Sequence, residues 1–165
     1  MLAGGEDKSY IFRRLVRFAS EDIGLADPMA VTHAMSAWQA YERLGSPEGE
    51  IALVQAVVYL ATAPKSNSIY VAQQRGKDLA LKSGSLMPPL NILNAPTSQL
   101  KGLGYGDGYV YDHDKEDGFS GQSYFPDSLQ REVLYNPKNR GFEREIKKRL
   151  DYWDKLRKGK QQEKK

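Results

Sequence analysis

The sequence predicts a mainly α fold: a bundle of helices, then an irregular extension, then a final amphipathic helix. Apolar residues recur at helical spacing in the first half and again at the end of the chain. Two pairs of a capping residue and a proline, Asp27-Pro28 and Ser46-Pro47, mark helix starts, and Gly24 and Gly45 mark helix ends. The chain has 165 residues, which is enough for one domain with a core of its own.

The first two helices follow from these signals. One apolar stripe is formed at i, i+4, i+7 and i+8 by Ile11, Leu15, Phe18 and Ala19. Gly24 ends this helix. The second begins at Asp27-Pro28, where a missing N–H costs nothing, and is expected to run to about Leu44.

The third helix is the most apolar. Residues 51–63 are apolar on nearly every face, so we expect this helix to be buried on all sides at the centre of the core. Pro64 breaks the chain, and a fourth helix with a wide polar face is expected to reach about Leu81.

The second half changes character. Residues 83–89 form a Gly, Ser and Pro linker, and a short helix is expected from about Asn94 to Leu103. A short β-ribbon is predicted from residues 109–111 and 132–135, which are rich in β-forming side chains. The last helix carries an inward apolar stripe of Phe142, Ile146, Leu150 and Trp153.

Composition and motifs favour a protein without catalytic groups. The absence of cysteine excludes a disulfide framework and a thiolate zinc site, and is typical of a cytoplasmic protein. The glycines of residues 102–108 lack the Lys-Ser/Thr of a phosphate-binding loop. Asp112, His113 and Asp114 offer metal-ligand chemistry, but neighbouring ligands in a loop seldom converge. We therefore expect no catalytic, cofactor-binding or metal-binding residue.

Charge is concentrated at the C-terminus. Residues 147–165 hold nine Lys or Arg and three Asp or Glu, a net charge of +6 in a chain whose total is +3. A basic end on a mildly acidic body is one indication of nucleic-acid contact, but it is more often simply a frayed, solvated C-terminus. The candidate DNA contacts are Lys147, Lys148, Arg149, Lys155, Arg157 and Lys158.

Arginines and aromatic residues suggest a protein interface, because both are enriched there. The alternatives for the arginines are a solvated helix face and phosphate binding. The alternatives for the aromatics are core packing and stacking on single-stranded bases. The candidate interface residues are Arg13, Arg14, Arg17, Glu21, Asp22, Trp38 and Tyr41.

Several irregular phrases occur in one order along the chain. They are residues 13–28 (RRLVRFASEDIGLADP), 47–50 (PEGE), 63–67 (APKSN), 94–97 (NAPT), 103–106 (LGYG) and 140–143 (RGFE). In these phrases, and over about residues 1–153, the chain resembles the C-terminal region of the RarA/MgsA AAA+ ATPases, the group that includes Werner-helicase-interacting protein.

The resemblance implies a bundle similar to the C-terminal collar of clamp loaders, serving as a tetramerisation domain of an ATPase at stalled or damaged replication forks. We expect the chain to divide into an oligomerisation core (1–84), an extension (85–158) and a disordered basic tail (159–165), and the tail has no counterpart in the family pattern. ATP and Mg²⁺ are implied only for an N-terminal module outside this sequence. The implied partners are further copies of the chain, DNA and replication-fork proteins, with no membrane partner, in the bacterial cytoplasm at the nucleoid. The alternative is a DNA-binding module that uses the basic C-terminal helix and tail.

Overall fold

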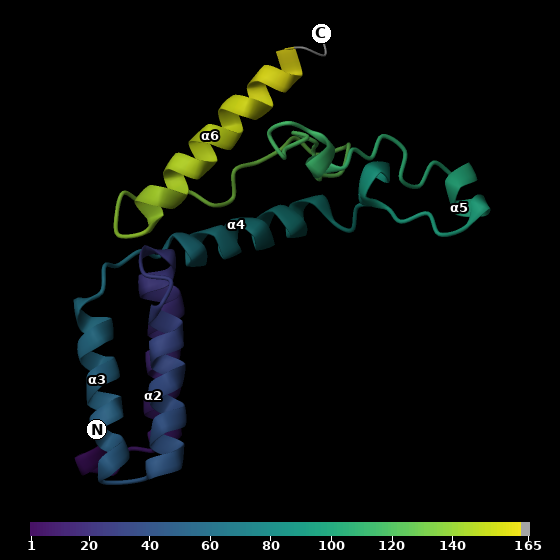
Figure 1. The fold of residues 1–165 in the computed structure, drawn as a ribbon. Coiled ribbons are helices and arrows are strands. Elements are labelled where there is room, and N and C mark those ends of the chain that lie inside the picture. Colours follow the sequence, from purple (N-terminus) through teal and green to yellow (C-terminus); the bar gives the residue numbers. More distant parts are fainter. Residues whose placement is uncertain (163–165) are drawn as a thin grey trace. The chain divides into compact units, whose positions relative to one another are not determined.

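The computed structural model describes residues 1–162 and confirms the mainly α fold (Figure 1). The chain forms two compact units, each made of two chain segments. One contains Met1–Arg75 and Leu134–Arg149, and the other Gly76–Val133 and Leu150–Lys165. This arrangement differs from the sequential division at residue 84 that we expected.

Three helices form the first unit's bundle: α1 (Lys8–Phe18), α2 (Ala30–Leu44) and α3 (Glu48–Thr62). The helices α2 and α3 run antiparallel side by side, and α1 packs on both (Figure 1). The core consists of two clusters of buried side chains, listed here in chain order: Ile11, Phe12, Ala37, Tyr41, Leu53 and Ala56, and then Ala19, Ile23, Ala30, Ala34 and Leu60.

Asp27 was predicted to cap the second helix, but the N-cap residue of α2 is Met29, without a side-chain capping bond. The Asp27 Oδ1 atom accepts a hydrogen bond from the Met29 N–H at 3.0 Å, directly before α2 begins at Ala30. Its Oδ2 atom accepts from the Tyr59 hydroxyl at 2.6 Å. The hydrogen bond to Asp27 raises the pKa of Tyr59. Asp27 therefore both shapes the start of α2 and links it to α3.

Helix α3 is not buried on all sides, and that prediction is wrong. Leu53, Ala56 and Leu60 are 6, 3 and 1 % exposed, but Ile51, Val54 and Val58 are 75, 60 and 57 % exposed. Only α1 and α2 contact α3 extensively, and they contact one side of it. Its opposite side consequently has no neighbour among the described residues of its unit.

The second unit contains the later part of α4 (Ser68–Ser83), the short α5 (Ser98–Gly102), two 3₁₀ turns (Leu90–Ile92 and Asp112–Asp114) and the later part of α6 (Glu143–Gln162). The expected helix near Asn94 begins instead at Ser98, after the Thr97 cap.

No strand occurs within residues 1–162, so the predicted β-ribbon is wrong. The Gln122 side chain replaces a ladder partner. Its Oε1 atom accepts from the Val110 N–H at 3.1 Å, and its amide nitrogen donates to the Gly108 carbonyl oxygen.

Helix α6 extends through Gln162, so residues 159–162 of the expected tail are helical, while 163–165 lie outside the described residues. Its predicted inward stripe is only partly covered: Ile146 and Leu150 are half-buried, whereas Phe142 and Trp153 are exposed. No helix in the described part of the chain is long and apolar enough to cross a membrane.

Candidate functional site

The arginine face of α1 consists of Arg13, Arg14 and Arg17 together with Tyr10. The spacing i, i+3, i+4, i+7 places these four residues on one side of the helix, and all four are exposed. They line a shallow recess of about 460 Å³ together with Val16. Three of the predicted interface residues are thus brought together.

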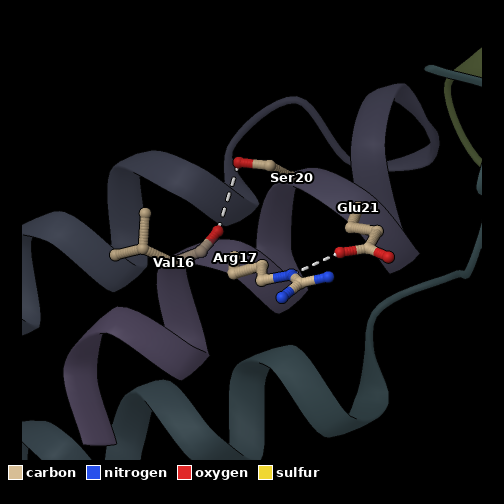
Figure 2. Close-up of polar contacts among 4 residues, drawn as sticks. All are labelled: Val16, Arg17, Ser20 and Glu21. Atoms are coloured by element: carbon tan, nitrogen blue, oxygen red, sulfur yellow. Dashed lines mark hydrogen bonds and ion pairs between the residues drawn. The ribbon is translucent and has the colours of Figure 1, made fainter. Parts of the chain in front are cut away.

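Two more predicted residues, Glu21 and Asp22, lie in a π-helical turn that follows α1 (Ala19–Ile23). Figure 2 shows the Arg17 side chain pointing toward Glu21, where Nε donates to Oε2 at 2.6 Å. Hydrogen bonding to Glu21, and then its charge, raise the pKa of Arg17. In the same view, Ser20 Oγ donates to the Val16 carbonyl oxygen at 3.1 Å. Turns of this type are frequent at functional sites.

The two predicted aromatic interface residues lie in the bundle instead. Tyr41 is 6 % exposed, and Trp38 is half-buried. Phe12 packs between them, stacked on Trp38 at 5.7 Å between ring centroids and edge-on to Tyr41 at 5.5 Å. These aromatic side chains stabilise the packing of α1 on α2.

The candidate DNA contacts on α6 divide into two groups. Lys147, Lys155 and Lys158 are exposed and have no ion pair among the described residues. The other three are engaged within the chain. Lys148 pairs with Glu145, Arg157 pairs with Asp154, and Arg149 lies over the Phe142 ring.

A further surface was missed by the sequence analysis. On α3, an apolar ridge runs through Ile51, Val54, Val58 and Ala61, at i, i+3, i+7 and i+10. These positions lie roughly opposite the buried stripe of Leu53, Ala56 and Leu60 on a helix of 3.6 residues per turn. The ridge therefore faces away from the bundle core. The signal was the all-round hydrophobicity of residues 51–63, which we read as burial.

Beside the ridge, α2 and α3 form a groove of about 250 Å³. His33 and Tyr59 close one part of it, with ring centroids 4.1 Å apart. Small side chains line much of the rest of the groove. Its lining residues are His33, Ser36, Ala37, Ala40, Ala52, Gln55, Ala56 and Tyr59.

The buried carboxylate of Glu143 joins two of the irregular phrases found in the sequence. Glu143 is fully buried and accepts hydrogen bonds from the hydroxyls of Ser66, at 2.6 Å, and Ser68. The Tyr135 hydroxyl and the Lys138 N–H each donate to it at 2.8 Å. Residues 63–67 and 140–143 thus meet in one structural network that attaches the start of α6 to the bundle.

Asp112 and His113 are held by contacts within their own part of the chain. The Asp112 carboxylate accepts from the Ser120 N–H at 2.7 Å, and hydrogen bonding to Ser120 lowers the pKa of Asp112. The His113 ring lies against Tyr111, with centroids 5.0 Å apart. Among the described residues, no group of three or more His, Cys, Asp or Glu side chains is placed to hold a metal ion.

Comparison with known proteins gives a consistent assignment. Residues 1–154 match the family model described as MgsA AAA+ ATPase C terminal. The chain is 51 % identical to Replication-associated recombination protein A of Coxiella burnetii over 157 residues, which are 94 % of this chain and 36 % of that protein.

Two further relatives agree. The protein of the same name from Escherichia coli K12 is 41 % identical over 151 residues, 91 % of this chain and 34 % of the relative. ATPase WRNIP1 of Dictyostelium discoideum is 40 % identical over 139 residues, 84 % of this chain and 16 % of the relative. The chain spans about a third of the length of the two bacterial relatives. It belongs to the MgsA family of AAA+ ATPases and corresponds to the C-terminal region of that family.

Proposed function

We propose that this chain is the self-association region of an AAA+ ATPase that acts at stalled or damaged replication forks in the bacterial cytoplasm, and that it assembles a homotetramer. The names of the relatives refer to replication and recombination, and this supports a role at replication forks. ATP and Mg²⁺ belong, in this proposal, to the AAA+ module of the whole protein.

The observation that carries the proposal is the exposed apolar ridge of α3. Isolated apolar side chains are normal on a protein surface, but a continuous ridge indicates an interaction site. Ile51, Val54 and Val58 are each more than half exposed and follow one another on a single helix face. Covering them removes apolar surface from water, which stabilises an assembly by about 25 cal/mol per Å² of buried area.

Self-association suits the C-terminal region of an AAA+ ATPase family. Most soluble oligomers are symmetric assemblies of one chain, and the same surface then serves on both copies. ATP-driven work requires subunits in a fixed arrangement, which such a region supplies. The arginine face of α1, with its neighbouring acidic residues Glu21 and Asp22, carries both signs of charge and is suited to a second contact between copies.

The test is the solution mass of the double variant Val54→Glu/Val58→Glu beside that of the unchanged chain. Two carboxylates in the interface have no cationic partner on the ridge, so we expect the dissociation constant to rise by at least about 100-fold. Both positions are exposed in the single chain, so its helix content should not change.

The matched control is Gln39→Glu, which introduces a carboxylate at an exposed position of α2 away from the ridge. This control should assemble as the unchanged chain does. The proposal fails if the double variant and the control have the same mass at every concentration.

A second candidate function is nucleic-acid binding through α6. It rests on Lys147, Lys155 and Lys158, which are exposed, unpaired among the described residues and placed on one side of the helix by their spacing. Ammonium groups in a row suit the phosphates of a nucleic-acid strand.

A further inference from the structure

We propose that α3 pairs antiparallel with α3 of a second copy of this chain, across a two-fold axis at the level of residue 56. The proposal rests on the self-association put forward above and adds the contact surface, the direction and the register.

The positions of the ridge residues are symmetric about residue 56. An antiparallel pair with its axis at that level places Val54 opposite Val58 of the other copy, and Ile51 opposite Ala61. A large side chain thus faces a small one at each end, while two valines meet near the axis on each side. Such alternation lets two helices approach closely with their side chains interdigitated.

The charges at the two ends of α3 favour the same direction. Glu48 and Glu50 lie in its first turn. At the other end, the Lys65 ammonium donates to the carbonyl oxygens of Leu60, Ala61 and Ala63, which places a positive charge at the carboxyl end of the helix.

An antiparallel pair therefore brings the acidic end of each α3 to the end that carries Lys65 in the other copy. The two helix dipoles are then also opposed, which is favourable. A parallel pair would place Glu48 beside Glu48 of the other copy and Ile51 beside Ile51. Like charges and the two largest ridge side chains would then coincide.

The ridge is poorly suited to bind a nucleic acid, the other partner considered for this chain. It carries no cation, so it has nothing to offer a phosphate backbone. It extends about 15 Å from Ile51 to Ala61 at 1.5 Å per residue, which matches a helix–helix contact between two equal elements. With the ends oppositely charged, the surface is complementary to itself.

Cysteine cross-linking tests the register directly, because the chain has no cysteine of its own. Val54→Cys and Val58→Cys are prepared as separate full chains, one with a short tag that makes its mass different. The two are mixed under reducing conditions, allowed to exchange, and then oxidised mildly. Gln39→Cys, at an exposed position of α2 off the ridge, is the control.

The proposal predicts that the mixed disulfide between positions 54 and 58 dominates. A disulfide requires Cα atoms within about 7 Å, and we expect it to exceed either homodimer by about fivefold. Two copies of position 54 are offset along the axis by about 6 Å, which adds to the separation of the helices and disfavours their bond. Gln39→Cys should show only collisional cross-linking.

The solution mass of each variant, measured without oxidation, separates the two proposals. A multimeric chain that forms mainly 54–54 and 58–58 disulfides, or none above the Gln39→Cys level, overturns the antiparallel pairing and leaves self-association standing. A chain that stays monomeric throughout overturns both. A multimer with dominant 54–58 bonds supports both.

Discussion

Glu143 is the residue on which the attachment of α6 to the bundle depends most. Its carboxylate is fully buried and is surrounded by neutral donors. Burial by itself raises the pKa of this carboxyl group, but hydrogen bonds from Ser66, Ser68, Lys138 and Tyr135 outweigh it, and the pKa lies below the ordinary value. The position of Glu143 at the start of α6 also favours the charged form.

The lowered pKa of Glu143 makes the stability of the fold depend on pH. Because the folded pKa of Glu143 is lowered, its stabilisation is present above the ordinary pKa of 4.5 and is lost as pH falls through the lower folded value. Tyr135 makes stability depend on pH in the alkaline range. Burial, and then its bond to Glu143, raise its pKa to about 12, so its contribution is present below about pH 10 and is lost as pH rises toward 12.

The corresponding variant is Glu143→Gln. An amide cannot accept from all four donors, and we expect a loss of about 2–4 kcal/mol at neutral pH. The decline of the melting temperature below pH 4.5 should also become shallower than in the unchanged chain. Thermal unfolding between pH 3 and pH 7 measures both. The control is Glu145→Gln, an exposed carboxylate in the same helix turn, and equal melting curves for the two variants would contradict this account.

Gly141 is the second residue whose identity is fixed by its surroundings. Its φ of +49° is in the left-handed region, and an added Cβ would lie 2.1 Å from the Ala26 carbonyl oxygen and 2.7 Å from Pro64. That same carbonyl accepts from the Phe142 N–H at 2.8 Å. The close approach brings the chain before α6 onto the end of the turn that precedes α2.

Gly141→Ala should therefore destabilise the first unit by at least about 2 kcal/mol, since both the backbone conformation and the contact must change. Gly159→Ala, in the exposed part of α6 with open space around it, is the opposite case and should raise helix stability slightly. Thermal unfolding compares the two. A melting temperature for Gly141→Ala at or above that of the unchanged chain would show that the contact is not required.

At the scale of elements, the sequence predicted the helices of the bundle well but not the covering of α3. Capping residues, prolines and apolar spacing locate helix ends because they act within one turn of the chain. Which face is covered depends on partners distant in sequence. For that reason Ile51 and Leu53, equally apolar and two residues apart, were both expected in the core, and only Leu53 is there.

The dependence of packing on residues distant in sequence also explains the other differences between prediction and structure. The Arg13, Arg14 and Arg17 face could be predicted, because helical spacing alone brings those side chains together. The burial of Tyr41 against Phe12 depends on how α1 packs on α2, so it could not be predicted from the sequence. The predicted β-ribbon does not form, because β-forming residues need a strand partner. The Gln122 side chain instead forms hydrogen bonds with Gly108 and Val110.

Nucleic-acid binding by helix α6 can be tested with charge-reversal variants of that helix. Lys155→Glu/Lys158→Glu should weaken binding of a fluorescent single-stranded oligonucleotide by about tenfold or more and reduce the slope of log affinity against log salt by about two. The matched control is Lys77→Glu/Lys82→Glu, which changes the net charge equally at two exposed positions of α4. Equal weakening by both pairs would point to overall charge, and no effect of the α6 pair would exclude this helix.

At the scale of the whole molecule, three of the six irregular phrases that carry the family resemblance contribute to structural contacts. Residues 63–67 and 140–143 build the Glu143 network, and the turn at Asp27 links α2 to α3. The surface proposed for self-association lies instead on an apolar helix of ordinary composition. In our proposal, this region holds the subunits together, and the chemistry of ATP belongs to the AAA+ module of the whole protein.

The proposed self-association of the chain is tested best by its solution mass, measured by light scattering after size exclusion at moderate salt and several concentrations. We predict a mass four times that of the 18.6 kDa chain at the highest concentrations, with smaller species on dilution. A mass of one chain at every concentration up to the high micromolar range would contradict the account.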